Sequence, residues 1–244
     1  MKFRFVLAAA AAAAALLFVS CNNTPVDEEE EDDDEPGLVD TSAIQIDGDF
    51  ADWEGLEGVA EATLPKGDVA FEAMRVFKAY ADPDYIFLYF EMDKSDLATM
   101  DLFIDTDNSK ATGQTANWPE MGAEVLLQAS FNPSQSIGAS TYNPIVRLYG
   151  GEEGGTDWAW VDEAGMNFTT SSAAVDKGGN VIAVELKMIR ELMVPVVFGD
   201  SFTIGAIIEN TGWSIVGKLP AITEDEKAEG TQEAGLVVRV SPKA

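Results

Sequence analysis

The stretch VFKAYADPDYIFLYFEM, residues 76–92, decides the fold class. Two runs rich in aromatic and aliphatic residues, 76–81 and 85–92, flank the tripeptide Asp82-Pro83-Asp84. Proline presets the backbone of a turn, and aspartate carboxylates can accept hydrogen bonds from the backbone within it. The stretch therefore predicts a β-hairpin.

Short β-rich runs continue outward from this hairpin, separated by Gly, Pro, Asn and Asp. They predict further strands at residues 100–104, 123–131, 144–149, 157–161, 166–174, 180–187, 201–209, 213–217 and 236–240. Asp176-Lys177-Gly178-Gly179 predicts a second hairpin, and one short helix is predicted at 188–193, ended by Pro195. Because sustained helical periodicity is nearly absent, the pattern predicts an all-β protein, an antiparallel β-sandwich with one short helix.

Charge and composition exclude several classes of function. The chain of 244 residues has 43 acidic and 15 basic residues, a net charge of −28, no His and one Cys. Binding to phosphate backbones needs clustered Lys and Arg, which excludes nucleic acid as a partner. Without His, neither a Ser-His-Asp triad nor a His/Cys zinc site can form, and one Cys cannot form an internal disulfide. Carboxylate chemistry or ligand binding remains.

The N-terminal segment has the features of a lipoprotein leader. Lys2 and Arg4 precede an apolar, Ala-rich run, which predicts a signal peptide over residues 1–20. The segment ends in Phe18-Val19-Ser20-Cys21, which resembles the lipobox of bacterial lipoproteins, although Phe stands where Leu is usual. The resemblance implies lipidation at Cys21, and the acyl chains would anchor the protein in a membrane. The alternative is an ordinary signal peptide followed by an incidental cysteine.

An acidic linker follows. Residues 21–37 comprise Cys21 and a polar tract with nine consecutive acidic residues at 27–35, which predicts a disordered spacer. Such a run behind the lipidated cysteine resembles the export signal of some surface lipoproteins, which implies an outer-membrane location facing the cell exterior. The alternative is a spacer on a lipoprotein that faces the periplasm. The folded domain is then expected over residues 38–244.

A set of ordered motifs resembles a known family. The stretch IQIDGDFADW at 44–53 is followed by FKAY at 77–80, YIFLYF at 85–90, FIDTDN at 103–108, Thr112-Gly113, GAE at 122–124, VELK at 184–187 and IGAIIEN at 204–210. This order is similar to the family 9 carbohydrate-binding modules and the related DOMON-like β-sandwiches. The resemblance implies a ligand-binding sandwich associated with polysaccharide degradation. Glu124 stands where that family usually has Asp.

Asp105, Asp107 and Asn108 lie at the end of a predicted strand and offer three oxygen donors of the type that calcium prefers. The start of an EF-hand loop is present, but Lys110 and Ala116 occupy its Gly and Glu positions, so an EF-hand is excluded. We therefore expect a calcium site in a sandwich loop, completed by Glu124 or by backbone carbonyls. The alternative is an Asx-turn network that only ends the strand.

The tryptophans are the candidate sugar-binding residues, since a sugar needs an aromatic face for its C–H surface and polar groups for its hydroxyls. Two predicted ligand-binding groups combine these features: Trp118 with Asn117 and Glu120, and Trp213 with Glu209 and Asn210. For both tryptophans the alternative is a structural role. Trp158 and Trp160 share one face of a predicted strand, where they form either a core wall or a stacking platform. Trp53 is expected to close the first loop and to plug one end of the sandwich.

Three classes of function follow. The first is a non-catalytic carbohydrate-binding lipoprotein, tethered at the surface or in the envelope and supported by calcium. The second is a glycosidase with paired carboxylates, for which so acidic a chain gives no specific signal. The third is a structural or assembly lipoprotein that binds another envelope protein, with an acidic surface that favours basic partners.

Overall fold

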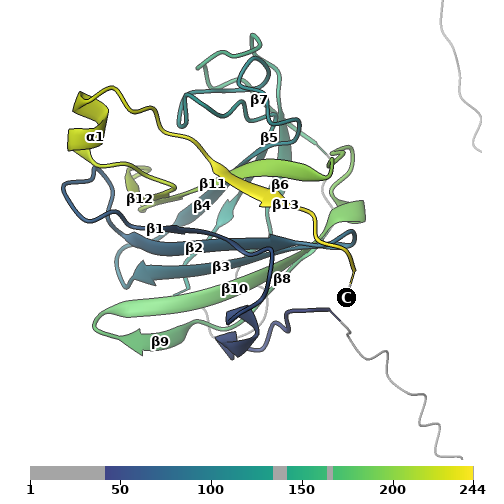
Figure 1. The fold of residues 1–244 in the computed structure, drawn as a ribbon, viewed down its shortest axis with the longest axis vertical. Helices are drawn as coiled ribbons and strands as arrows, with labels where there is room; N and C mark the ends of the chain where they lie inside the picture. The colour runs from purple at the N-terminus through teal and green to yellow at the C-terminus, as the bar shows by residue number, and fades with distance from the viewer. Residues whose placement is uncertain (1–41, 134–141, 164–166, 244) are drawn as a thin grey trace, which may run out of the picture. The chain divides into compact units, whose positions relative to one another are not determined.

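The computed structural model describes residues 42–133, 142–163 and 167–243. The predicted signal peptide, Cys21 and the acidic linker lie outside the described residues. Two antiparallel sheets pack face to face (Figure 1). The predicted antiparallel β-sandwich is thus confirmed.

The first sheet has the strand order β1-β2-β3-β10-β8, and β9 also pairs with β10. Its strands are β1 (Ala60–Thr63), β2 (Met74–Ala81), β3 (Tyr85–Asp93), β8 (Thr169–Ser171), β9 (Val175–Gly178) and β10 (Val181–Ile189). The second sheet has the order β12-β11-β4-β5-β6-β7, and β13 also pairs with β11. Its strands are β4 (Thr99–Asp105), β5 (Val125–Ser130), β6 (Ile145–Tyr149), β7 (Trp160–Asp162), β11 (Ser201–Glu209), β12 (Ile215–Leu219) and β13 (Leu236–Arg239).

The hairpin predicted from residues 76–92 is formed by β2 and β3. In its turn, Asp82 Oδ1 accepts hydrogen bonds from the backbone N–H groups of Asp84 and Tyr85, at 2.8 and 2.7 Å. The second hairpin differs from the prediction, because Asp176 and Lys177 belong to β9 rather than to the turn. The chain reverses at Gly179 and Asn180, both with positive φ.

The helices differ from the prediction. Residues 188–193 do not form an α-helix; β10 continues to Ile189 and is followed by the 3-10 turn η2 (Arg190–Leu192). The one α-helix among the described residues is α1 (Glu224–Ala228), which the prediction missed. Thr223 and Glu226 form a capping box at its start, and this S/T-x-x-E signature is readable in the sequence.

Side chains from both sheets fill the space between them. The largest of these core residues include Phe77, Phe90, Phe131, Tyr142 and Phe202. Two smaller apolar clusters cover the outer faces of the sheets. The cluster outside the first sheet is built on Ile44, Trp53 and Tyr89, and the cluster outside the second sheet on Phe103, Trp118 and Leu126. Both sheets are therefore partly buried on both faces.

A buried carboxylate holds the first loop against the first sheet. Glu185 Oε1 accepts hydrogen bonds from the N–H groups of Asp47 and Gly48, at 3.0 and 2.8 Å, and its Oε2 accepts one from Trp53 Nε1 at 3.1 Å. Gly48 has a φ of +84°, which favours glycine. Trp53 lies at the end of η1 (Phe50–Trp53) and packs on Tyr89. It closes the first loop as predicted, but it does so on the outer face of the first sheet and not at an end of the sandwich.

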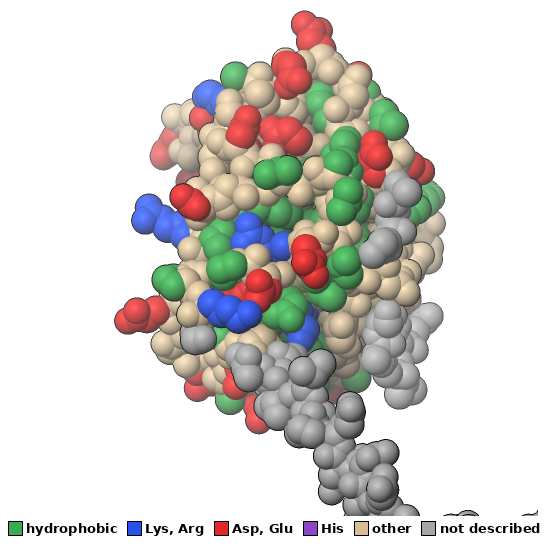
Figure 2. Space-filling view, turned by 90° about the vertical axis from the view of Figure 1, so that its right-hand side faces the viewer, with side chains coloured by type: hydrophobic (Ala, Val, Ile, Leu, Met, Phe, Trp, Pro, Cys, Tyr) green, Lys and Arg blue, Asp and Glu red, His purple; other side chains and the backbone are tan. Residues whose placement is uncertain are grey.

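The surface reflects the acidic composition. On the face drawn in Figure 2, acidic side chains are spread widely, and the basic ones are fewer. Over the described residues, no helix has the length and apolarity needed to cross a membrane.

Substituting Glu185 by Ala is expected to lower the free energy of unfolding by about 3 kcal/mol, because the buried Trp53 Nε1 and two partly buried backbone N–H groups lose their acceptor. Glu185→Gln keeps one carbonyl oxygen as an acceptor, so the decrease in its free energy of unfolding should be smaller. Urea unfolding of both variants measures the difference. Equal losses would show that the carboxylate does not hold the loop.

Candidate functional site

A strip of polar side chains crosses the outer face of the second sheet. Residues paired across neighbouring strands point to the same face, as do residues two apart on one strand. The register therefore places Glu209 of β11, Asp101 of β4, Gln128 of β5 and Arg147 of β6 on one face. Their neighbours on these strands, such as Leu102, belong to the core between the sheets. The four polar side chains thus face outward.

Hydrogen bonds connect this strip. Gln128 Nε2 donates to Asp101 Oδ2 at 3.0 Å, and Arg147 donates from its NH1 group to Gln128 Oε1 at 2.7 Å. Arg147 Nε also lies 2.8 Å from Asp162 Oδ1 on β7. Both ends of the Gln128 amide are therefore used, which fixes its orientation between the acid and the guanidinium group.

Two carboxylate oxygens in the strip have no hydrogen-bond partner within the described part of the chain: Asp101 Oδ1 and Glu209 Oε2. Asp101 is only 2% exposed, and this burial raises its pKa to about 7, with a further increase from the charge of Glu209. Gln128 and Arg147 act in the opposite direction on the same pKa. Burial also raises the pKa of Glu209.

Two exposed tryptophans stand over the strip. Trp158 is 59% exposed and Trp213 is 65% exposed. Together with Gln128, Arg147 and Glu209 they line an open pocket of about 390 Å³. Exposed indole rings above hydrogen-bonding side chains are the combination that binds the apolar face and the hydroxyls of a sugar.

Local structure presents each of the two rings. Trp213 has a φ of +59° in the turn between β11 and β12. Asn210 Oδ1 supports this turn by accepting hydrogen bonds from the N–H groups of Gly212 and Ser214, at 2.9 and 3.1 Å. Trp158 precedes β7 and packs edge-on against Trp160, with ring centroids 6.3 Å apart.

The ring of Trp118 is buried, so it does not offer the exposed aromatic face that the predicted ligand group requires. Trp118 is 2% exposed, donates from Nε1 to the carbonyl of Pro220 at 2.8 Å and packs against Phe103. A Cβ at Gly205 would lie 2.5 Å from the indole, so glycine there lets the ring sit on the sheet.

The polar partners proposed for Trp118 have other roles. Glu120 pairs with Lys110 at 2.6 Å. The backbone carbonyl of Asn117 accepts a hydrogen bond from Lys218 Nζ, also at 2.6 Å. Lys218 Nζ in turn lies over the Trp118 ring, 4.9 Å from its centroid. This group therefore closes the outer face of the sheet beside the pocket.

The second predicted group lies at the pocket. Trp213 and Glu209 line it, whereas the side chain of Asn210 shapes the turn. The sequence allowed Trp158 to be either part of a core wall or part of a stacking platform. In the structure Trp158 is exposed, whereas Trp160 packs on Phe103.

Sequence reasoning missed Gln128, Arg147 and Asp101. Their one signal was a polar residue inside each of three strands, as in MDLF at 100–103, LLQA at 126–129 and IVRLY at 145–149.

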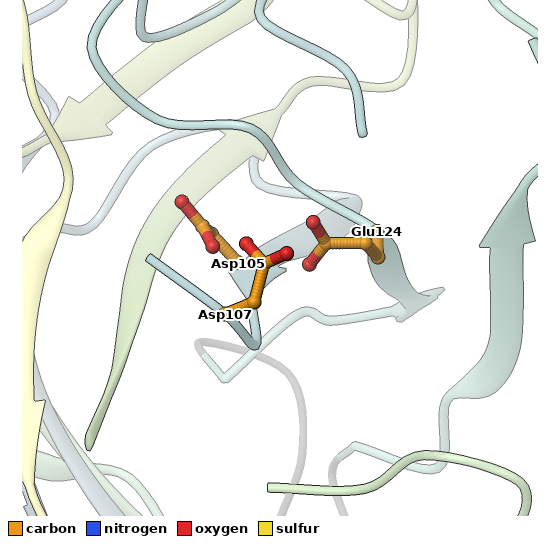
Figure 3. Close-up of side chains that lie close together, drawn as sticks. All are labelled: Asp105, Asp107 and Glu124. Carbon is orange, nitrogen blue, oxygen red and sulfur yellow. The ribbon is translucent and has the colours of Figure 1, made fainter. Parts of the chain in front are cut away.

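A separate cluster of carboxylates forms at the end of β4 (Figure 3). Asp105, Asp107 and Glu124 each place one oxygen within 4.8 Å of the others. Asp105 accepts hydrogen bonds from the N–H groups of Ser109 and Gly122, at 3.2 and 3.1 Å. Burial and the neighbouring acids raise the pKa of both Asp105 and Glu124.

Asn108 does not join this cluster, contrary to the predicted metal set. Its side chain donates to Ser201 on β11 and accepts a hydrogen bond from Thr203 Oγ1 at 2.8 Å. Glu124 Oε2 accepts a hydrogen bond from the N–H of Thr106 at 2.8 Å. Glu124 Oε1 is buried without a partner among the described residues.

The pKa of Asp101 makes a testable link between pH and stability. Because its folded-state pKa of about 7 lies above the ordinary value of 3.8, the free energy of unfolding should fall as the pH rises from about 4 to about 7. Asp101→Asn removes this charge, so at pH 8 it should be more stable than the parent by on the order of 2 kcal/mol. Near pH 4 the parent and the variant should have similar free energies of unfolding. Denaturant unfolding at both pH values tests this, and a constant difference would contradict it.

Comparisons with known proteins give a similarity to solved structures. The chain matches no protein-family model and no curated protein. Among solved structures it is similar to a carbohydrate binding module family 9 (CBM9) from Caldicellulosiruptor kristjanssonii in complex with cellotriose. The identity is 12%, the TM-score is 0.39, and the match covers 82% of this chain and 91% of that one. That family is the one the ordered motifs resemble, while the assignment of an antiparallel β-sandwich rests on the pairing of this chain's own strands.

Proposed function

We propose that the protein is a non-catalytic carbohydrate-binding lipoprotein. The observation that carries the proposal is the pocket with two exposed tryptophans, Trp158 and Trp213, above the polar strip. Exposed indoles of this size are costly to leave in water, since burying an aromatic side chain is worth about 2 kcal/mol or more. A ligand that covers them gains that free energy.

The strip supplies the polar half of the site. The Arg147 guanidinium can donate to sugar oxygens, and the carboxylate of Glu209, which lines the pocket, can accept a hydrogen bond from a hydroxyl. Because Gln128 and Asp162 already hold Arg147, little side-chain freedom remains to be lost on binding. A preorganised polar floor with aromatic walls favours an oligosaccharide over an extended protein surface.

The proposal also places the domain on a lipid anchor. With Cys21 acylated and residues 21–37 as a spacer, the pocket would be held at the outer membrane, facing the cell exterior, as the sequence predicts. In that position the protein would retain polysaccharide for neighbouring enzymes or transporters.

Calcium is the second part of the proposal. Asp105, Asp107 and Glu124 would bind it, and the donor set of three carboxylates fits a hard cation. The buried, unpartnered Glu124 Oε1 supplies a ligand atom that nothing else satisfies in the described chain. The ion would join the end of β4 to the start of β5 and so stabilise the loop between them.

Substituting Trp158 or Trp213 by Ala should weaken glycan binding at least about tenfold, because each change removes one aromatic wall. Val161→Ala, an exposed change on β7, is the control and should leave affinity unchanged. Affinity electrophoresis across polysaccharides identifies a ligand, and calorimetry measures its affinity. If some glycan binds equally well to both tryptophan variants, the pocket is not the site. If none binds the parent, the assembly lipoprotein is the better explanation.

Calcium should raise the melting temperature by several degrees, since a ligand that binds only the folded state stabilises it. Asp105→Ala and Asp107→Ala should abolish the rise. Asp49→Ala, which changes an acid at the first loop, should keep it. Thermal unfolding with calcium and then with chelator makes the test. A parent protein that shows no rise would leave the three carboxylates as a hydrogen-bonded strand end.

A further inference from the structure

The loop before β7 carries Trp158 into the pocket, and the hydrogen bonds of this loop show how the exposed ring is held. The loop covers residues 150–157 and contains four glycines. Because glycine restricts the backbone least, such a loop would leave the indole free to move unless other contacts fix it. The ring is 59% exposed and packs edge-on against Trp160, so packing covers only part of it.

Asp157, the residue directly before Trp158, is held from two sides. Its Oδ1 accepts a hydrogen bond from the hydroxyl of Tyr149 at the end of β6. Its backbone carbonyl accepts a second one from Gln114 Nε2 at 2.7 Å. A Cβ at Gly151 would collide with both Tyr149 and Asp157, so glycine there lets the loop close around this pair. Both the side chain and the backbone of Asp157 are therefore fixed.

Gln114 connects the loop to the second sheet. It is 4% exposed, and its backbone N–H and carbonyl both bond to Ala123, at 2.8 and 2.9 Å. Beside it, the N–H of Thr115 donates to the carbonyl of Gly155 in the loop at 2.9 Å. Ala123 lies just before β5, the strand that also carries Gln128 in the floor of the pocket.

Tyr149 connects the same loop to β6. It follows Arg147 by two positions and so lies on the same face of the strand. Its ring packs on Trp160 with centroids 5.3 Å apart, and Trp160 in turn supports Trp158. One strand thus carries both a polar group of the floor and the support of an aromatic wall.

We infer that Tyr149 and Gln114 are positioning residues of the glycan site, which hold Asp157 so that Trp158 stands over the polar strip before a ligand arrives. This inference rests on the proposed function. Neither side chain is among the described residues that line the pocket. They act through Trp158, because an aromatic wall that is already in place loses less conformational entropy on binding, which raises the affinity.

Tyr149→Phe tests the inference, since it keeps the ring on Trp160 and removes only the hydroxyl. Affinity electrophoresis of the full chain in hydroxyethyl cellulose, xylan, mannan, laminarin, pectin and starch gives the dissociation constant of each glycan that binds. The variant should bind about three- to tenfold more weakly than the parent. Tyr89→Phe is the matched control, because Tyr89 also donates to a carboxylate, that of Glu91, but lies in the cluster outside the first sheet. It should keep the affinity of the parent.

Further variants assign the effect to the Tyr149–Asp157 hydrogen bond. Asp157→Ala removes the acceptor and should weaken binding about as much as Tyr149→Phe. The double variant should weaken binding no further, because both changes break the same bond. Asp157→Asn keeps a side-chain oxygen as an acceptor and should recover most of the affinity. Gln114→Met, which has a similar size but no donor, should cause a separate loss of about threefold.

Fluorine NMR of protein labelled with fluorotryptophan separates positioning from a general loss of stability. The line that disappears in Trp158→Phe identifies Trp158, and Trp213→Phe identifies Trp213 in the same way. Without any ligand, Tyr149→Phe should shift or broaden the line of Trp158. The line of Trp213, which lies in the turn between β11 and β12, should stay unchanged and serves as the internal control.

The outcomes separate the inference from the proposed function. An unchanged affinity of Tyr149→Phe, an equal loss in Tyr89→Phe, or an unchanged Trp158 line would overturn the positioning role and leave carbohydrate binding intact. If the parent binds none of the six glycans, the proposed function fails and the inference fails with it.

Discussion

Burial of the central strand β4 on both faces is the constraint on which the rest of the structure depends. All seven of its residues are buried. One face contributes to the core between the sheets, and the other must be covered from outside, where Trp118 packs on Phe103. Asp101 lies on that outer face, so a carboxylate is desolvated because of its place in the strand. The polar strip and the pocket follow from this arrangement.

Much of the fold could be predicted from the sequence, because its signals are local. The turn at Asp82-Pro83-Asp84 and the alternating runs beside it give the β2–β3 hairpin directly. The prediction of a helix at 188–193 was wrong because β10 continues to Ile189. Pairing of β10 with β3 overrides the helical propensity of these residues. The short strands β1 and β9 gain their stability from neighbours, which the sequence around them does not reveal.

The candidate site was less predictable, because it depends on register between strands far apart in the chain. Glu209 and Trp213 could be found beside a strand end, but Asp101, Gln128 and Arg147 come together only through pairing across β4, β5 and β6. Trp118 shows the opposite difficulty. Its polar loop suggests exposure, yet the loop folds back so that the indole reaches the backbone at Gly205. The three carboxylates were predictable as a group, apart from Asn108, which bonds to β11 instead.

The pocket divides its parts between rigid strands and connecting loops. Gln128 and Arg147 stand on strands in the middle of the sheet, whereas Trp158 precedes the short β7 and Trp213 lies in a turn. Loops tolerate insertion and replacement far better than strands do. Related proteins could thus acquire new ligands by exchanging the two aromatic loops while keeping the sheet unchanged. In this arrangement, specificity can evolve without cost to folding.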